Sequence, residues 1–211
     1  MTSLLQRTRR LSLTWVVILL IVSSGLCLPR RATAKNFSTV VIDPGHGGND
    51  KGSNWYGVYE KNLTLDLSKR IQRMLKAKGI PTVLTRNSDT YVSLDKRAAI
   101  ANRKSHFVFV SIHFNGHRNT SYTGIETFYY PGSSKGRRLA TKIQHELGNR
   151  ILTRNRGIKA SRLKVLRITK GPAVLIECGF LSNKWENKRC NSAWLREIIA
   201  AEIVQGIMAY Q

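Results

Sequence analysis

The hydrophobic and polar positions of the chain alternate between short apolar runs and longer segments with helical periodicity. Short apolar or alternating runs predict strands, and they lie at residues 39–42, 82–84, 107–112, 124–130 and 174–176. Segments in which apolar residues recur at helical spacing predict helices, and they lie at residues 60–78, 94–104, 139–152 and 194–210. Strands that alternate with helices along a chain indicate an α/β layer fold.

The first 34 residues follow a different pattern. Three arginines within residues 7–10 precede residues 11–28, a stretch without a charged side chain. A basic segment followed by an apolar one is the order of a secretory signal, and the small residues at 32–34 predict cleavage before Lys35. The apolar stretch is also long enough to span a bilayer. Residues 1–34 are therefore either a signal peptide or an uncleaved signal anchor, and both interpretations predict export to the periplasm, the cell envelope or the medium.

Length and charge set further limits. The chain has 211 residues, so residues 35–211 are expected to form one domain with a core of its own. This part keeps 30 basic against 12 acidic residues, a net charge of +18. Such an excess indicates polyanionic surroundings, although a basic surface that only aids solubility is the alternative. In an exported protein Cys178 and Cys190 are candidates for a short-loop disulfide, although two cysteines do not establish one.

For an exported protein, the partners that fit this charge are anionic wall polymers or acidic membrane lipids. Nucleic acid, the first expectation for a basic cytosolic protein, is disfavoured because the chain carries an export signal and has no recognition motif. We expect a monomer that binds no nucleic acid.

Ionisable residues follow three of the predicted strands at the point where each ends. His46 comes shortly after the first strand, His113 directly follows residues 107–112, and Glu177 directly follows residues 174–176. In open α/β sheets, sites form beyond the carboxyl ends of the strands. We therefore expect these three side chains to converge although they are far apart in the sequence.

Glu60 lies at the N-terminal tip of the predicted helix 60–78, near the centre of its apolar stripe. A carboxylate that points inward is costly unless it is paired or bound to a metal. An acid that merely complements the helix dipole is the alternative, but two strand-end histidines favour the metal. Two histidines and one glutamate form a known catalytic zinc set with a fourth position for water, which leaves Glu177 as a base that is not a ligand. Lone histidines are expected to be structural, and this applies to His106, His117 and His145.

The sequence resembles the zinc-dependent N-acetylmuramoyl-L-alanine amidases of the catalytic type often called amidase 3. The matching motifs cover essentially all of residues 35–211 in the right order and spacing: 41–48, 60–63, 84–86, 88–89, Leu94, Arg97, 101–102, 111–115 and 173–183. The resemblance implies a single domain with a twisted, mostly parallel sheet of about six strands flanked by helices. It also implies hydrolysis of the amide bond between N-acetylmuramic acid and L-alanine in peptidoglycan, a reaction of wall remodelling or daughter-cell separation.

The resemblance assigns roles to individual residues. Glu177 would be the catalytic glutamate, and one zinc ion per chain would be held by His46, Glu60 and His113. Asn115 would line the substrate pocket, and Glu126 would be an extra acid near the zinc, with an ordinary exposed strand residue as the alternative. The remaining motif residues include two arginines, Arg86 and Arg97, which we expect to pair with Asp89 or Asp95.

Two departures from the family pattern add expectations. Some periplasmic relatives insert a helical plug between the second histidine and the catalytic glutamate. Here only 64 positions separate His113 from Glu177, so we expect an open site. We also expect no appended wall-binding domain, which makes the basic surface the candidate for attachment. A zinc peptidase acting on the stem peptide remains an alternative, whereas the complete set of four residues disfavours a catalytically silent wall-binding module.

Overall fold

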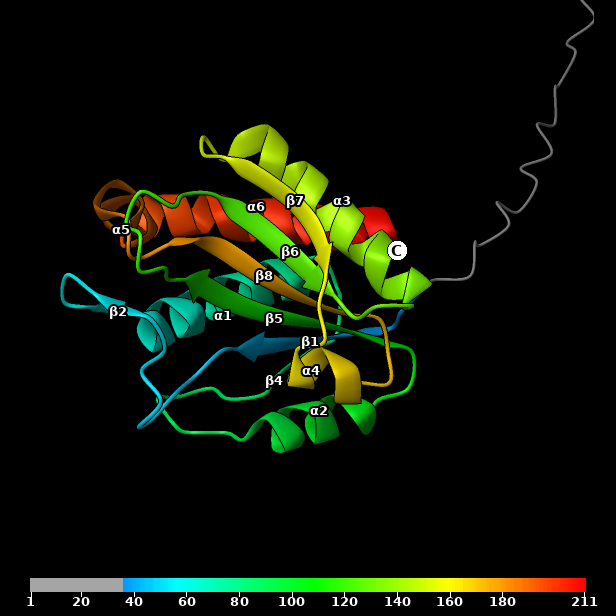
Figure 1. Ribbon diagram of the computed structural model, residues 1–211. Coiled ribbons are helices and arrows are strands. Elements are labelled where there is room, and N and C mark those ends of the chain that lie inside the picture. The colour runs from blue at the N-terminus through cyan, green and yellow to red at the C-terminus, as the bar shows by residue number, and fades with distance from the viewer. Residues whose placement is uncertain (1–35) are drawn as a thin grey trace, which may run out of the picture. The chain divides into compact units, whose positions relative to one another are not determined.

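Six strands form one twisted sheet in the order β4-β1-β5-β8-β6-β7 (Figure 1). The computed structural model describes residues 36–211, so the predicted signal or anchor lies outside the described residues. The strands are β1 (Thr39–Pro44), β4 (Thr82–Leu84), β5 (Phe107–Asn115), β6 (Ile125–Tyr129), β7 (Asn155–Ala160) and β8 (Ala173–Phe180). A separate hairpin is formed by β2 (Asn54–Trp55) and β3 (Val58–Tyr59).

Within the six-stranded sheet, four of the five strand pairings are parallel, and only β6 and β8 pair antiparallel. This confirms the predicted mostly parallel sheet of about six strands. Because β1, β5 and β8 are parallel neighbours, their carboxyl ends meet at one edge of the sheet. The antiparallel β6 brings its first residues to that same edge, where Glu126 lies opposite Glu177.

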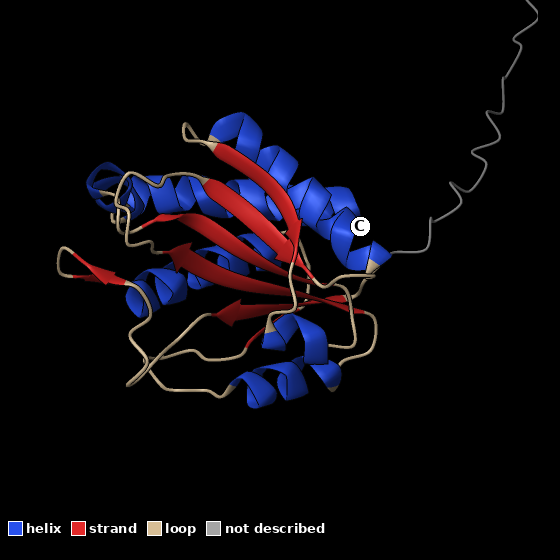
Figure 2. Cartoon of the chain, in the orientation of Figure 1, coloured by secondary structure: helices blue, strands red, loops and turns tan. Residues whose placement is uncertain are grey.

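Helices cover both faces of the sheet (Figure 2). One face packs against α1 (Glu60–Ala77), α3 (Ser134–Arg150) and α6 (Ala193–Tyr210), and the other against α2 (Leu94–Asn102) and α4 (Lys164–Ile168). Successive side chains of a strand point to opposite faces, so Val40 and Ile42 join the first core and Val41 joins the second. A short α5 (Lys184–Cys190) follows β8.

The helix α1 illustrates how the sequence forms these elements. Its buried apolar residues recur at helical spacing: Leu63, Leu67, Ile71 and Leu75. The helix ends before Gly79, which has a φ of 71° and supplies the left-handed conformation that commonly closes a helix. In residues 36–211, no helix combines the length and the apolar character needed to cross a bilayer.

Each predicted strand and helix is present, β4 with the predicted bounds and the others with shifted ones. Three strands are longer than predicted, because pairing continues past the apolar runs to Pro44 in β1, to Asn115 in β5 and to Phe180 in β8. The sequence analysis missed the β2–β3 hairpin, β7, α4 and α5. The strand β7 is exposed along one edge of the sheet and its sequence, Asn-Arg-Gly-Ile-Lys-Ala, offers neither an apolar run nor a clear alternation.

Candidate metal centre

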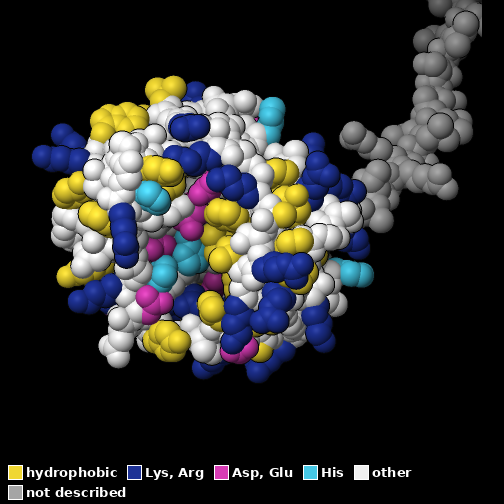
Figure 3. Space-filling model, viewed as in Figure 1, with side chains coloured by type: hydrophobic (Ala, Val, Ile, Leu, Met, Phe, Trp, Pro, Cys, Tyr) yellow, Lys and Arg dark blue, Asp and Glu magenta, His cyan; other side chains and the backbone are white. Residues whose placement is uncertain are grey.

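Four predicted site residues meet at the edge where β1, β5 and β8 end. His46 follows β1, and His113 and Glu177 are register partners on neighbouring strands. Glu60 is the first residue of α1 and is buried. Histidine and acidic side chains gather in a hollow on this side of the molecule (Figure 3). The expected convergence of residues far apart in the sequence is therefore present.

The carboxylate of Glu60 lies between the two histidines. Its Oε1 is 3.1 Å from Nε2 of His46 and 3.0 Å from Nδ1 of His113. One donor atom from each of these three residues lies within 4.8 Å of the other two. Two imidazole nitrogens and one carboxylate oxygen form the donor set that catalytic zinc sites use, so these residues fit a zinc ion.

Backbone groups fix the position of Glu60. The amide of Ser53 donates to its Oε2 at 2.7 Å, and the amide of Phe114 donates to its Oε1 at 3.0 Å. Burial by itself would raise the pKa of Glu60, but hydrogen bonds and charge from His113 and His46 outweigh burial and hold that pKa below its usual value. The carboxylate is therefore charged, as a metal ligand requires.

Two buried arginines hold the backbone that carries His46. That residue has a φ of 61°, in the left-handed region that non-glycine residues seldom occupy. Nη2 of Arg97 donates to the carbonyl of His46 at 2.7 Å. Arg86 donates from Nε to the carbonyl of Pro44 at 3.0 Å and from Nη2 to that of Gly45 at 2.8 Å. These bonds stabilise the turn that presents the imidazole.

The predicted partners of these arginines were wrong. Arg97 pairs with Asp43 at 2.8 Å, and Arg86 mainly binds backbone carbonyls. The two acids that were expected to pair with these arginines pair with lysines instead. Lys61 pairs with Asp89, and Lys164 pairs with Asp95. The buried carbonyls after β1 need donors, and the two guanidinium groups satisfy several at once.

Glycine is required where the strand end passes the second histidine. A Cβ atom on Gly45 would lie 2.4 Å from Cε1 and 2.5 Å from Nε2 of His113. A similar limit applies to Gly52, where a Cβ would lie 2.5 Å from Oε2 of Glu60 and 2.6 Å from Cδ2 of His46. These glycines allow the candidate ligands to approach one another closely.

Glu177 differs from Glu60 in its surroundings. Its Oε2 is buried and has no hydrogen-bond partner. Burial raises the pKa of Glu177 well above its usual value, and the negative charges of Glu60 and Glu126 raise it further. A carboxylate with a raised pKa and a free oxygen beside a metal set has the properties of a general base.

A cavity of about 510 Å³ contains these groups. Besides the candidate ligands and Glu177, it is lined by Trp55 of the hairpin, Asn115, His117, Arg118 and Leu163. Sequence reasoning missed Trp55, Arg118 and Leu163, which lie on a two-residue strand or in loops that have no periodicity. His117 stacks on Tyr122 with 3.9 Å between ring centroids and does not join the donor group.

Asn115 and Glu126 both lie at this edge. Asn115 lines the cavity and donates from Nδ2 to Oε1 of Glu126 at 3.0 Å. Glu126 is buried and also pairs with Lys159. The alternative of an ordinary exposed strand residue is therefore wrong for Glu126.

The cavity is open to solvent. The His46 and His113 side chains are 22% and 17% exposed. Helix α3 is the longest helix between His113 and Glu177, and it packs against α6 on one face of the sheet. No residue of α3 lines this cavity. No helix of the described residues plugs the site, in agreement with the short interval between His113 and Glu177.

The candidate disulfide is not formed, because Cys178 and Cys190 are both free and buried. Cys190 directs its Sγ toward the carbonyl oxygen of Cys178, 3.9 Å away. Burial raises the pKa of the Cys190 thiol to about 12. Both residues therefore serve as small apolar groups of the core.

The chain is similar to known proteins over most of its length. A family model described as N-acetylmuramoyl-L-alanine amidase matches residues 40–209. The N-acetylmuramoyl-L-alanine amidase LytC of Bacillus subtilis is 36% identical over 174 residues, which are 82% of this chain and 35% of LytC. The uncharacterized protein YqiI of the same organism is 37% identical over 175 residues, covering 82% of this chain and 84% of YqiI.

A solved structure shares the fold. The crystal structure of the N-acetylmuramoyl-L-alanine amidase from Clostridium difficile 630 matches with a TM-score of 0.79 and 41% identity. The match covers 83% of this chain and 97% of that one. The chain spans about a third of the length of LytC, so the similarity to LytC concerns one part of that larger protein.

Proposed function

Because the chain belongs to the N-acetylmuramoyl-L-alanine amidase family, we propose that it hydrolyses the amide bond between N-acetylmuramic acid and the L-alanine of the stem peptide in peptidoglycan. One observation carries the proposal: a buried charged carboxylate, two histidines and a free glutamate oxygen lie around one open cavity. This arrangement provides a metal set and a separate base, the two parts that metal-assisted amide hydrolysis needs.

His46, Glu60 and His113 would hold one zinc ion per chain. The donor set fits zinc because it combines two imidazole nitrogens with a carboxylate that other groups keep ionised. When bound, the ion supplies Lewis acidity, which polarises the scissile carbonyl and acidifies a water molecule.

Glu177 moves the proton. Its unpartnered Oε2 accepts the proton of the attacking water and later delivers it to the nitrogen of the departing L-alanine. Burial raises the pKa of Glu177, so this carboxylate takes up the proton of water more readily than an ordinary glutamate would. Asn115 and Trp55 line the cavity and would contact a bound substrate.

The proposed organisation follows from the substrate. Peptidoglycan lies outside the cytoplasmic membrane, so residues 1–34 act as the export signal or anchor and residues 35–211 act as the catalytic domain. A peptidase that cuts within the stem peptide would use the same metal set, and the products of the reaction separate the two activities.

The test combines metal content with product analysis. The full chain is incubated with purified peptidoglycan, and the released material is analysed by mass spectrometry. We expect about one zinc per chain and intact stem peptides that begin with a free L-alanine amine. Glu177→Gln should keep the zinc and lose at least about 10²-fold in rate. Glu146→Gln, on α3 away from the cavity, is the matched control.

Other outcomes contradict the proposal in distinct ways. Shortened peptides left on intact glycan would indicate a peptidase. Zinc without any cleavage would indicate a binding module, and a chain that binds no zinc would overturn the metal centre.

A further inference from the structure

A second hollow lies at the opposite end of the sheet from the metal centre. It consists of a cavity of about 770 Å³ and an adjoining one of about 520 Å³, which share Asn36, Ser133, Ser134 and Tyr210 among their lining residues. Phe107, the first residue of β5, lines the smaller cavity, whereas His113 near the other end of that strand belongs to the metal centre. The two hollows therefore use opposite ends of the same strands.

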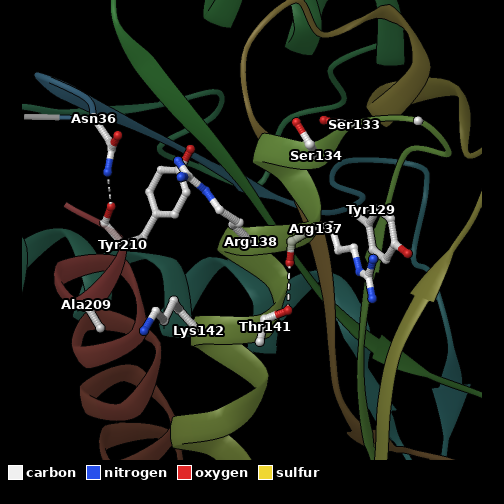
Figure 4. A pocket seen from close by; sticks show the side chains of 11 residues that line it. Asn36, Tyr129, Ser133, Ser134, Arg137, Arg138, Thr141, Lys142, Ala209 and Tyr210 are labelled. Atoms are coloured by element: carbon white, nitrogen blue, oxygen red, sulfur yellow. Dashed lines mark hydrogen bonds between the residues drawn. The ribbon is translucent and has the colours of Figure 1, made fainter.

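Six cations line this hollow, which we call the basic groove: Lys104, Lys135, Arg137, Arg138, Lys142 and Lys170. All six residues are exposed. Figure 4 shows Arg137 and Arg138 extending from one turn of α3 and Lys142 from the next, with Arg138 beside the ring of Tyr210. No acidic residue lines either cavity.

The cations of the basic groove are not neutralised within the described part of the chain. None of the six forms an ion pair with residues 36–211, whereas Arg70 and Arg73 on α1 both pair with Glu197. Hydroxyl groups of Ser134 and Thr141 stand among the cations. Like charges gathered in a hollow repel one another unless an anion joins them, so the basic groove fits a surface that carries many phosphate groups.

The position of the basic groove indicates which phosphate surface it meets. Asn36, the first described residue, lines both cavities and donates from Nδ2 to the carbonyl of Tyr210 at 2.6 Å. Only residues 29–35 separate Asn36 from the uncharged stretch 11–28. Seven residues span at most about 25 Å, and this short connection contains three further cations, Arg30, Arg31 and Lys35.

We propose that residues 1–34 stay attached as the anchor and that the basic groove docks on acidic phospholipid headgroups of the membrane that holds residues 11–28. Basic clusters next to an apolar segment are typical of segments that bind acidic lipid. Docking there would place the metal centre on the side of the domain that faces away from the bilayer. An anionic wall polymer would offer similar phosphates, but it gives no reason for the groove to lie where the chain leaves the apolar stretch.

Lysine footprinting on the full chain tests the proposal. The chain is reconstituted in bilayers of phosphatidylglycerol or of phosphatidylcholine, lysines are acetylated briefly, and each site is quantified by mass spectrometry. We expect Lys104, Lys135, Lys142 and Lys170 to react several-fold less in phosphatidylglycerol, with the protection weakened by high salt. Lys51 and Lys184, which line neither cavity of the groove, should react equally in both bilayers.

A charge-matched pair of variants separates a specific groove from general attraction. Arg137→Gln/Arg138→Gln/Lys142→Gln should abolish the protection of Lys104 and Lys170 in phosphatidylglycerol. Lys69→Gln/Lys184→Gln/Lys188→Gln removes the same charge elsewhere and should preserve it. Both variants should hydrolyse detached peptidoglycan like the parent chain, so a failure of docking is distinct from a failure of the proposed function.

Three results would overturn the proposal. Equal labelling of the groove lysines in both bilayers would exclude docking on acidic lipid. Equal loss of protection in the two triple variants would show that only net charge matters. Protection by added poly(glycerol phosphate), with none from phosphatidylglycerol, would assign the groove to a wall polymer instead.

Discussion

Asp43 and Arg97 form a buried ion pair, with Oδ1 and Nη1 2.8 Å apart, beside the backbone that carries His46. Hydroxyl groups of Thr85 and Ser111 complete the shell of Asp43. The same guanidinium donates to the carbonyl of His46 at 2.7 Å. The ion pair thus connects the core of the sheet to the first candidate metal ligand.

Arg97→Gln tests this connection. The substitution leaves Asp43 buried without its cation, and such changes cost about 3–5 kcal/mol of folding free energy. It also frees the carbonyl of His46, so we expect zinc affinity to fall by about 10–100-fold, as is typical for residues that orient metal ligands. Urea unfolding and competition with a chelator measure the two effects. Arg154→Gln, an exposed arginine, is the control, and zinc affinity unchanged in Arg97→Gln would reduce the role of Arg97 to stability alone.

Gly45→Ala tests the close approach of strand β1 to the second histidine. The added methyl group would lie 2.4 Å from Cε1 of His113 and would displace the ring. We expect the chain to stay folded and to lose most of its zinc, measured as metal content alongside circular dichroism. Gly132→Ala is a strict control, because a Cβ there meets no atom within 4 Å although the φ of 81° strains an alanine backbone. Normal zinc content in Gly45→Ala would show that the site tolerates a shifted ring.

Glu126→Gln is expected to change the pH profile. Glu177 must be ionised to accept a proton, so the rate falls as the pH drops through the pKa of Glu177. The negative charge of Glu126 raises that pKa, and its removal also leaves Lys159 unpaired nearby. Both effects lower the pKa of Glu177, so the acidic limb of kcat/KM should move to lower pH. Lys159→Gln should move the acidic limb to higher pH. An unchanged limb in both variants would show that Glu126 does not influence the pKa of Glu177.

The ion pairs of Asp66 with Arg70 and Arg196 should make the stability of the fold depend on pH. Burial would raise the pKa of Asp66, but Arg70 of α1 and Arg196 of α6 outweigh burial and lower it. Because the pKa of Asp66 is lower in the folded state, its carboxylate contributes to the free energy of unfolding. This contribution is complete above the unfolded-state pKa near 4, and it is lost as the pH falls through the folded-state pKa. Because the carboxylate is partly exposed, Asp66→Asn should cost only about 1 kcal/mol at neutral pH.

Thermal unfolding across pH checks the Asp66 prediction. The difference in Tm between Asp66→Asn and the parent chain should shrink toward zero as the carboxylate of the parent becomes protonated. Glu202→Gln, on α6 and outside the described ion pairs, should show little difference at any pH. A difference that persists in acid would mean that packing rather than charge links α1 to α6.

Local patterns predicted much of the fold. The stripe of Leu63, Leu67 and Ile71 identifies α1, and strand-end chemistry identifies His113 and Glu177, because both depend on residues close in the sequence. The family resemblance is confirmed, and it implies the same zinc ligands that strand-end and helix-end chemistry had already indicated.

Non-local relationships were not predictable in the same way. The partner of Arg97 on α2 lies 54 positions away on strand β1, and the choice between Asp43 and nearer acids depends on which carbonyls become buried. Trp55 and Leu163 reach the cavity from a short hairpin and a loop, where no periodicity indicates direction. The free thiols of Cys178 and Cys190 likewise depend on core packing that the sequence spacing does not specify.

The reversed direction of β6 has a consequence for how this site diversifies. Because β5 leaves the sheet at the site edge and β6 enters there, residues 116–124 cross that edge without passing through the core. This loop contributes His117 and Arg118 to the cavity wall. The length and sequence of this loop can therefore change to suit different substrates, while the strands and the candidate metal ligands stay the same.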